Sequence, residues 1–160
     1  MNNLKRVLAI DPGFDRMGIA VVEGDASKPT YVWSDCILPP KGTREARLYA
    51  VQRAAEQAIA QYAPDVFALE TLFFSTNVKT AIGVAEARGA ILAAAGKAGC
   101  RVVECSPQEV KLAVTGYGAA DKTAVARMIP QLISLPPKKR LDDELDAIAL
   151  GIAALTKRFS

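Results

Sequence analysis

The chain has 160 residues, of which 51% are hydrophobic and 23% are charged, and its net charge is +3. This composition excludes a disordered chain and predicts a single globular domain over residues 1–160, while the small net charge does not by itself indicate a nucleic-acid partner. No apolar stretch reaches the roughly 20 residues that span a bilayer, and the N-terminus has no signal-peptide pattern, so we expect a cytoplasmic protein without a membrane segment.

Three predicted strands open the chain, and the short loops between them favour antiparallel pairing. They lie at about 6–10, 17–22 and 30–38. Thr43 is a typical N-cap for a helix that continues to about Tyr62, where Pro64 ends it. A buried strand then follows at about 65–70.

The second half of the chain alternates helices with one more strand. A helix rich in alanine and glycine is predicted at 77–97, and its small residues allow another element to approach closely, either the sheet or a second copy of the chain. A strand follows at 101–105, and then three helices that begin near Ser106, Asp121 and Asp142. Ser106 and Glu109 form a capping-box pattern. This order predicts an α/β fold with a mixed five-stranded sheet between layers of helices.

Four acidic residues are placed where the predicted fold would gather them. Asp11 and Glu70 end hydrophobic strands, and Asp143 and Asp146 lie one turn apart on the last helix. Each has an ordinary explanation, namely an Asp-Pro-Gly turn, an ion pair at a strand end, or attraction to the positive end of a helix. The helix-end explanation suits Asp142 and Glu144 well and Asp146 poorly, because the effect fades within the first turn. A shared site explains all four residues together.

The chemistry of such a site follows from its ligand types. Carboxylate oxygens without histidine or patterned cysteines favour Mg²⁺ or Mn²⁺ over zinc. The absence of histidine also excludes an imidazole base. Cys36, Cys100 and Cys105 are expected to be buried free thiols.

Several basic and aromatic residues are open to two interpretations. Lys111 and Lys122 flank a glycine-rich loop, and Lys138, Lys139 and Arg140 precede the acidic start of the last helix. Taken singly, each of these cations is expected to be a solvated surface residue. Phe73 and Phe74 follow Glu70, and alternation along an extended segment would turn one of them inward and the other outward.

Six segments of the chain resemble those of the RuvC family of bacterial Holliday junction resolvases, in the same order and at similar spacing. They are IDPG at 10–13, ALE at 68–70, ARG at 87–89, PQEVK at 107–111, GYG at 116–118 with Lys122, and DELDA at 143–147. The ordered set covers nearly the full chain, which makes it far more specific than any one of these short motifs.

The resemblance implies an RNase H-like three-layer fold, a homodimer, and paired hydrolysis of four-way junction DNA by two metal ions per active site, with Mg²⁺ expected and Mn²⁺ as a substitute. It assigns the metal-binding catalytic positions to Asp11, Glu70, Asp143 and Asp146. It places Lys111 and Lys122 at the DNA backbone and Phe73 at the bases of the branch point. It also suggests a partner helicase that migrates the branch point, and a role in recombination and repair.

Two other functions remain open at this stage. One is an RNase H-like nuclease that acts on structured RNA, of the YqgF type, which also opens with an Asp-x-Gly turn. The other is a non-catalytic subunit that binds junctions, although a pure DNA-binding protein gains nothing from four carboxylates that repel DNA. An actin-like ATPase would need two such domains, and 160 residues provide only one.

Overall fold

A computed structural model of the protein describes residues 4–71 and 78–157, in which five strands form one mixed sheet. The strands are β1 (Lys5–Asp11), β2 (Met17–Gly24), β3 (Pro29–Ile37), β4 (Val66–Glu70) and β5 (Arg101–Cys105). They lie in the order β3-β2-β1-β4-β5, so the chain begins in the middle of the sheet and builds outward on both sides. All five predicted strands are confirmed, with ends shifted by one or two residues.

The central position of β1 decides where the acidic residues lie. β1 pairs antiparallel with β2, where Asp11 is opposite Gly18, and parallel with β4, where Ile10 is opposite Leu69. Parallel neighbours end at the same edge of a sheet. Asp11 and Glu70, the last residues of β1 and β4, therefore lie side by side at that edge.

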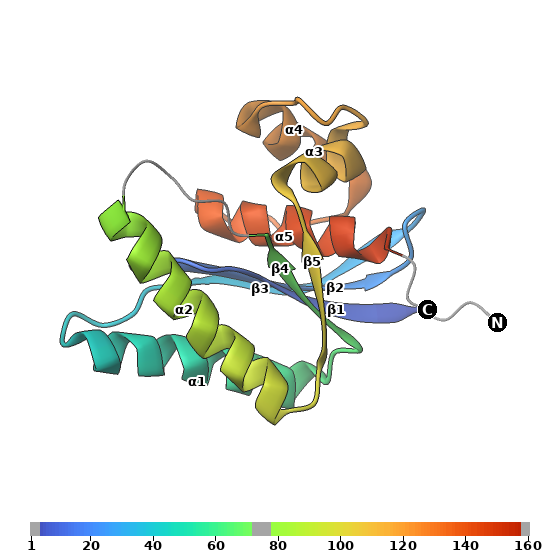
Figure 1. The fold of residues 1–160 in the computed structure, drawn as a ribbon. Helices are drawn as coiled ribbons and strands as arrows, with labels where there is room; N and C mark the ends of the chain where they lie inside the picture. The colour runs from blue at the N-terminus through green and yellow to red at the C-terminus, as the bar shows by residue number, and fades with distance from the viewer. Residues whose placement is uncertain (1–3, 72–77, 158–160) are drawn as a thin grey trace.

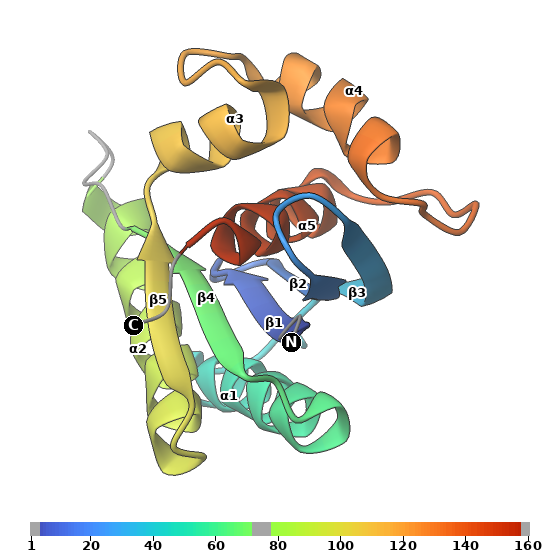
Figure 2. The ribbon, with the colours of Figure 1, turned by 90° about the vertical axis from the view of Figure 1, so that its right-hand side faces the viewer.

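Helices cover both faces of the sheet, as Figures 1 and 2 show. One face carries α1 (Arg44–Tyr62) and α2 (Val78–Lys97), and the other carries α5 (Asp142–Leu155), beyond which lie α3 (Pro107–Thr115) and α4 (Lys122–Leu132). Two separate clusters of buried apolar residues fill the spaces above and below the sheet. The predicted three-layer α/β architecture is thus confirmed.

Side-chain caps fix the starts of three helices at the residues that the sequence indicated. Thr43 accepts a hydrogen bond from the Ala46 amide at 3.3 Å, and Asp121 accepts one from the Ala124 amide at 2.7 Å. Ser106 and Glu109 complete the capping box of α3. No helix in the described part of the chain is long and apolar enough to cross a membrane.

The three cysteines are free thiols, but they differ in burial. Cys105 is fully buried, and burial raises its pKa to about 11. Cys36 and Cys100 are only partly buried, so the expectation of three buried thiols is correct for Cys105 alone. Cys36 is the next-to-last residue of β3, and Cys100 lies between α2 and β5.

Gly18 allows α5 to lie directly on β2. A Cβ atom at Gly18 would stand 1.8 Å from the backbone oxygen of Asp143, so any side chain there would collide with the first turn of α5. Because Gly18 is also the cross-strand partner of Asp11, this contact places the start of α5 next to the end of β1. The strand and the helix thereby bring Asp11 and Asp143 together.

We predict that Gly18→Ala lowers the free energy of unfolding by about 1–3 kcal/mol, the usual cost of overpacking. The Asp143 backbone can escape the added methyl group only if α5 moves away from the sheet. Urea denaturation measures the change. Gly96→Ala is the matched control, because Gly96 lies in α2 with nothing near its Cβ position, and this change should stabilise the helix by about 0.5–1 kcal/mol. Equal stability of Gly18→Ala and wild type would contradict the contact.

Candidate active site

Four carboxylates line one cavity of about 390 Å³ at the carboxyl edge of β1 and β4. Asp11 and Glu70 reach it from the two strand ends, and Asp143 and Asp146 reach it from successive turns of α5. Lys111 from α3 and Lys122 from α4 complete the polar wall. The structure therefore brings six of the seven residues singled out in the sequence to one place.

The seventh residue, Phe73, lies outside the described residues, as does Phe74. Which of the two would face DNA stays a prediction. Lys111 is half-buried in the wall of the cavity, and Lys122 is largely exposed at its rim. Lys122 is solvated as expected and Lys111 is partly so, and both lie beside the four carboxylates.

Burial and mutual repulsion raise the pKa values of three of the carboxyl groups. The pKa of Asp11 is raised to about 7, mainly by burial and further by the charges of Asp146, Glu70 and Asp143. The pKa values of Glu70 and Asp146 are also raised, again mainly by burial. Near neutral pH the buried Asp11 is thus close to half protonated unless a positive charge joins it.

Two side-chain cations partly neutralise the cavity. Lys122 Nζ lies 3.2 Å from Asp146 Oδ2, and Arg16 Nε lies 3.0 Å from Asp143 Oδ2. The ion pair with Asp146 raises the pKa of Lys122, which keeps this lysine charged. The helix-end interaction explained Asp146 poorly, and in the structure this carboxylate pairs with Lys122. Arg16 was missed, because nothing in the β1–β2 turn signals a contact with a helix 127 residues further along the chain.

The donor set suits a hard divalent cation, although the carboxylates are not arranged around one point. Among residues 4–71 and 78–157, no three acidic or thiol groups converge closely enough to hold a metal ion as they stand. The contacts of Asp146 with Lys122 and of Asp143 with Arg16 explain this, since each turns a carboxylate toward a side chain. Asp143 Oδ2 is buried and receives no well-directed hydrogen bond. An oxygen in this state, beside an Asp11 of raised pKa, fits a metal ligand.

Arg88 holds the end of β4 in place. It is a buried residue of α2, and its Nη1 donates a hydrogen bond of 2.8 Å to the backbone oxygen of Glu70 while Nη2 pairs with Glu104 on β5. Fixing the Glu70 carbonyl fixes the direction in which its side chain leaves the strand. In the sequence, Arg88 belongs to the ARG segment at 87–89, but nothing there indicated a contact with the backbone of Glu70.

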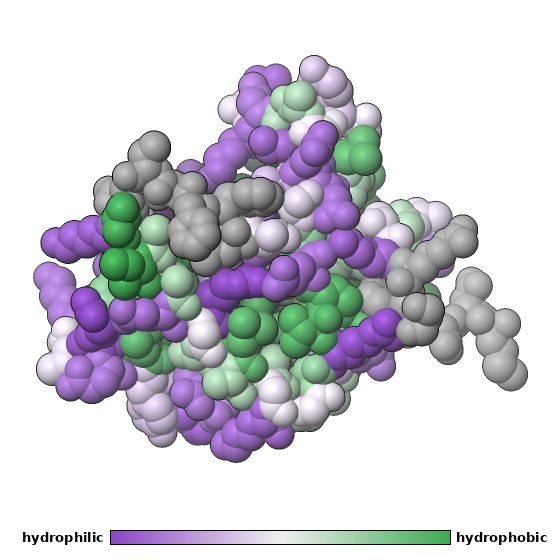
Figure 3. Space-filling view, in the orientation of Figure 1, coloured by the Kyte–Doolittle hydropathy of each residue, from purple (hydrophilic) through white to green (hydrophobic). Residues whose placement is uncertain are grey.

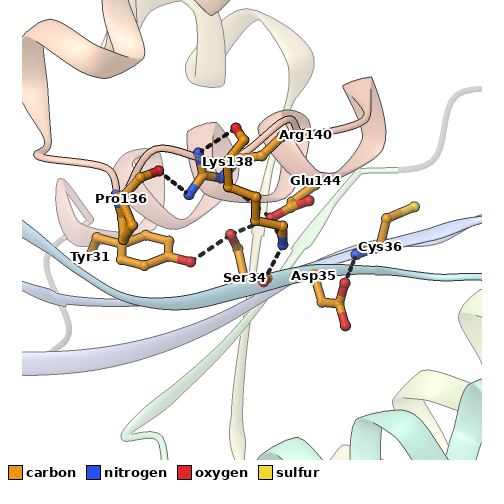
Figure 4. Close-up of polar contacts among 8 residues, drawn as sticks. All are labelled: Tyr31, Ser34, Asp35, Cys36, Pro136, Lys138, Arg140 and Glu144. Atoms are coloured by element: carbon orange, nitrogen blue, oxygen red, sulfur yellow. Dashed lines mark hydrogen bonds and ion pairs between the residues drawn. The ribbon is translucent and has the colours of Figure 1, made fainter.

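A buried ion-pair network anchors the first turn of α5 to β3, as Figure 4 shows. Glu144 accepts hydrogen bonds from Ser34 Oγ at 2.6 Å and Lys138 Nζ at 2.9 Å, and Arg140 Nε lies 3.4 Å away. Tyr31 adds its hydroxyl, 3.1 Å from Ser34 Oγ. Since Glu144 lies between Asp143 and Asp146 in the chain, the network holds the segment that carries both.

This network corrects two expectations from the sequence. Glu144 is 2% exposed, so its role is a buried ion pair and not only attraction to the helix end. The Arg140 side chain is also buried and lies over the Tyr31 ring, where a solvated residue was expected. The physical reason is pairing, because a buried carboxylate needs cations and hydrogen-bond donors close to it.

Comparison with known sequences gives one consistent answer. The family model described as "Crossover junction endodeoxyribonuclease RuvC" matches residues 7–154. The RuvC protein of Moorella thermoacetica is 41% identical over 147 residues, which cover 91% of this chain and 88% of the relative. That of Rubrobacter xylanophilus is 42% identical over 159 residues, which cover 96% of this chain and 87% of the relative.

Solved structures agree with the sequence comparison. Thermus thermophilus RuvC in complex with a Holliday junction substrate superposes with a TM-score of 0.87 at 29% identity, covering 93% of this chain and 92% of that one. The yeast mitochondrial Holliday junction resolvase shares the fold, with a TM-score of 0.69 at 12% identity over 94% of this chain and 79% of that one. The RNase H-like fold expected from the sequence is confirmed.

We predict that the metal-free protein loses stability as the pH rises from about 4 to 8. A carboxyl pKa raised from 3.8 to about 7 means that the folded state binds the proton more tightly than the unfolded state, so deprotonation opposes folding. Asp11→Asn, which resembles the protonated acid, should flatten this decline. Thermal melting in EDTA at pH 5 and pH 8 measures it, with about 2–4 °C expected per kcal/mol.

Divalent metal should raise the melting temperature of the wild type at pH 8 and have little effect on Asp11→Asn. Asp142→Asn, an exposed acid in the first turn of α5, is the matched control and should behave as wild type. If Asp11→Asn and wild type showed the same pH dependence and the same response to metal, Asp11 would not be at the centre of the charge cluster.

We also predict that Glu144→Gln lowers the free energy of unfolding by about 1–3 kcal/mol, because it leaves the buried Arg140 without its counterion. Urea denaturation measures this loss. Asp142→Asn again serves as the control, with a change below about 1 kcal/mol from the helix-end interaction alone. Equal effects of the two substitutions would mean that Glu144 acts only through the helix end.

Proposed function

Since this chain belongs to the RuvC family of crossover junction endodeoxyribonucleases, we propose that its acidic cavity is the active site that hydrolyses phosphodiester bonds of four-way DNA junctions. The chain is thus a nuclease of DNA recombination and repair. The observation that carries the assignment of the site is the convergence of Asp11, Glu70, Asp143 and Asp146 on one cavity.

We propose that these four carboxylates hold divalent metal, with Mg²⁺ as the expected ion, Mn²⁺ as a substitute, and two ions per active site. When bound, two such ions supply an activated hydroxide, stabilise the leaving alkoxide and screen the phosphoryl oxygens. The chain contributes an all-oxygen ligand set, held by two strand ends and one helix. Metal coordination requires Asp143 and Asp146 to part from Arg16 and Lys122.

Two lysines beside the acidic cavity are suited to contact DNA phosphates. Lys111 and Lys122 face the same cavity as the carboxylates, so a DNA strand whose phosphate lies there has a cation on the side of α3 and another on the side of α4. We propose that both bind the backbone near the cleaved bond. We further propose that Phe73 stacks on a base at the branch point, a role worth about 1–3 kcal/mol.

We propose that the protein acts as a homodimer through α2. This helix presents a stripe of small and apolar residues to solvent on one face, seen in part at the upper left of Figure 3. The stripe consists of Val78, Ile82, Ala85, Gly89 and Ala93. Val78 and Ile82 are 68% and 50% exposed, an unusual state for two neighbouring apolar residues. Small residues further along permit close approach of a second helix.

A twofold dimer suits the substrate, because a four-way junction has twofold symmetry and paired active sites can nick two strands. A complex with a helicase that migrates the branch point, a cytoplasmic location and a single domain over residues 1–160 stay predictions. The two alternatives, a nuclease for structured RNA and a non-catalytic subunit, are not favoured by the relatives found, which are named as junction endonucleases.

We predict metal-dependent, symmetric nicking of an immobile four-way DNA junction and no cleavage of the linear duplex made from the same sequences. Asp11→Asn should still bind the junction but leave it uncut, because it removes a metal ligand without removing a cation. Gel assays with Mg²⁺, Mn²⁺ and EDTA measure both properties. Junction binding without cleavage in either metal would indicate a non-catalytic subunit, and preference for structured RNA would indicate the alternative nuclease.

We predict that Gly89→Arg converts the dimer to a folded monomer. A side chain at Gly89 meets nothing within 4 Å in the monomer, so the fold tolerates it, whereas a second helix packed on the stripe does not. Light scattering with size-exclusion chromatography measures the mass, and circular dichroism verifies folding. Gly42→Arg is the control. A side chain at Gly42 also meets nothing within 4 Å, and this variant should stay dimeric. An unchanged mass for Gly89→Arg would place the interface elsewhere.

A further inference from the structure

A second cavity of about 550 Å³ adjoins the active site and is not explained by catalysis. It is bounded by the β1–β2 turn with Phe14 and Arg16, by Arg44 at the start of α1, and by Lys79 and Gly83 in the first turns of α2. Asp143 lines both cavities, so the two adjoin at this residue. We call it the basic groove. The starts of α1 and α2, which contribute lining residues to it, lie at the left of Figure 1.

The basic groove is lined by more cationic side chains than it has carboxylates to pair with them strongly. Arg16 faces Asp143 at 3.0 Å, and Arg44 is 68% exposed with a distant partner, Glu86, at 3.4 Å. Lys79 is exposed. Exposed pairs of this kind contribute little to stability, so these cations can turn to a stronger anion at small cost. Asp15 already forms an ion pair with Arg47, whose Nη2 lies 2.7 Å from Asp15 Oδ1.

The wall of the basic groove is firmly built. Arg47 is largely buried, donates to the backbone oxygen of Phe14 at 3.1 Å and lies over the Phe14 ring at 4.5 Å. Gly83 packs so closely on Phe14 that a Cβ there would stand 3.2 Å from the Phe14 side chain. The turn is thus braced by both α1 and α2. A braced turn holds Arg16 at a set position relative to Arg44 and Lys79.

From these features we infer that the basic groove binds the sugar–phosphate backbone of the DNA strand on one side of the cleaved phosphodiester. This inference rests on the proposed function. A DNA strand with one phosphate in the acidic cavity must continue out of that cavity on both sides. On the side of Asp143, the strand would pass Arg16, Arg44 and Lys79. A chain of phosphates is the anion that matches several cations spread along one channel. The contacts are to the backbone and do not read sequence.

The basic groove borders the proposed dimer face, because Ile82 lines the groove and also belongs to the stripe. Lys79 and Gly83 lie one position after Val78 and Ile82, so they are turned by about 100° around the helix from the stripe. The same two turns of α2 can therefore face a second copy with one side and DNA with the other. In a dimer, each of the two active sites would have its own groove for the DNA backbone.

The test is the salt dependence of junction binding in EDTA, measured by fluorescence anisotropy with a labelled four-way junction. Arg44→Gln and Lys79→Gln should each reduce the slope of log K against log [salt] by about 0.9, the value for one lost phosphate contact. Arg53→Gln and Lys97→Gln are matched controls on the same two helices, outside the groove, and should keep the slope of wild type. Melting temperatures verify that all four variants fold.

A second measurement locates the strand. A single neutral methylphosphonate linkage is placed at one position at a time beside the cleaved bond. At one or two positions, it should weaken junction binding by wild type and by Arg53→Gln. The same linkages should not weaken junction binding by Arg44→Gln or Lys79→Gln further, because each variant has already lost its contact with a phosphate. Equal weakening of all variants would overturn the inference, as would unchanged salt slopes for both groove variants.

These outcomes separate the inference from the proposed function. If wild type neither bound nor cleaved junctions selectively, the proposed function would fail. If wild type cleaved them and the groove variants matched their controls, only the basic groove would lose its role.

Discussion

The concentration of negative charge at one edge of the sheet is the constraint to which the surrounding structure responds. Asp11 and Glu70 meet there because β1 and β4 are parallel neighbours, and α5 adds Asp143 and Asp146. Burial and repulsion raise the pKa of Asp11 to about 7, which shows how unfavourable the fully charged cluster is without a cation. Arg16, Lys122 and the Glu144 network each hold one part of this cluster in place.

The features predictable from the sequence are those that local rules determine. Such features depend on residues within four positions of one another. They are the Asp-Pro-Gly turn that ends β1, the caps at Thr43 and Asp121, and the capping box of Ser106. Parallel pairing then brings Asp11 and Glu70 to one edge once the strand order is known. The convergence of the carboxylates was therefore visible before the structure.

The features that were missed depend on contacts between distant parts of the chain. Ser34 and Glu144 are 110 residues apart and form a buried hydrogen bond, and Lys138 and Arg140 join them only because the chain before α5 runs over β3. Composition makes such residues look like surface charges. The ARG segment at 87–89 stood out in the sequence, but the contacts of Arg88 did not, since its partners are a backbone oxygen and the side chain of Glu104 on another strand.

The pairing of Asp146 with Lys122 and of Asp143 with Arg16 makes the cavity a cation exchanger. The chain carries its own counterions, so an entering dication gains the attraction of the carboxylates and loses that of two side chains. Net metal affinity is lower than four free carboxylates would give, while each displaced side chain keeps its charge. Under the proposed function, a bound metal ion would leave Lys122 and Arg16 without these partners beside the DNA phosphates, so metal ion and DNA would strengthen each other's binding. Such reciprocity would make full loading of the site with metal depend on the DNA substrate.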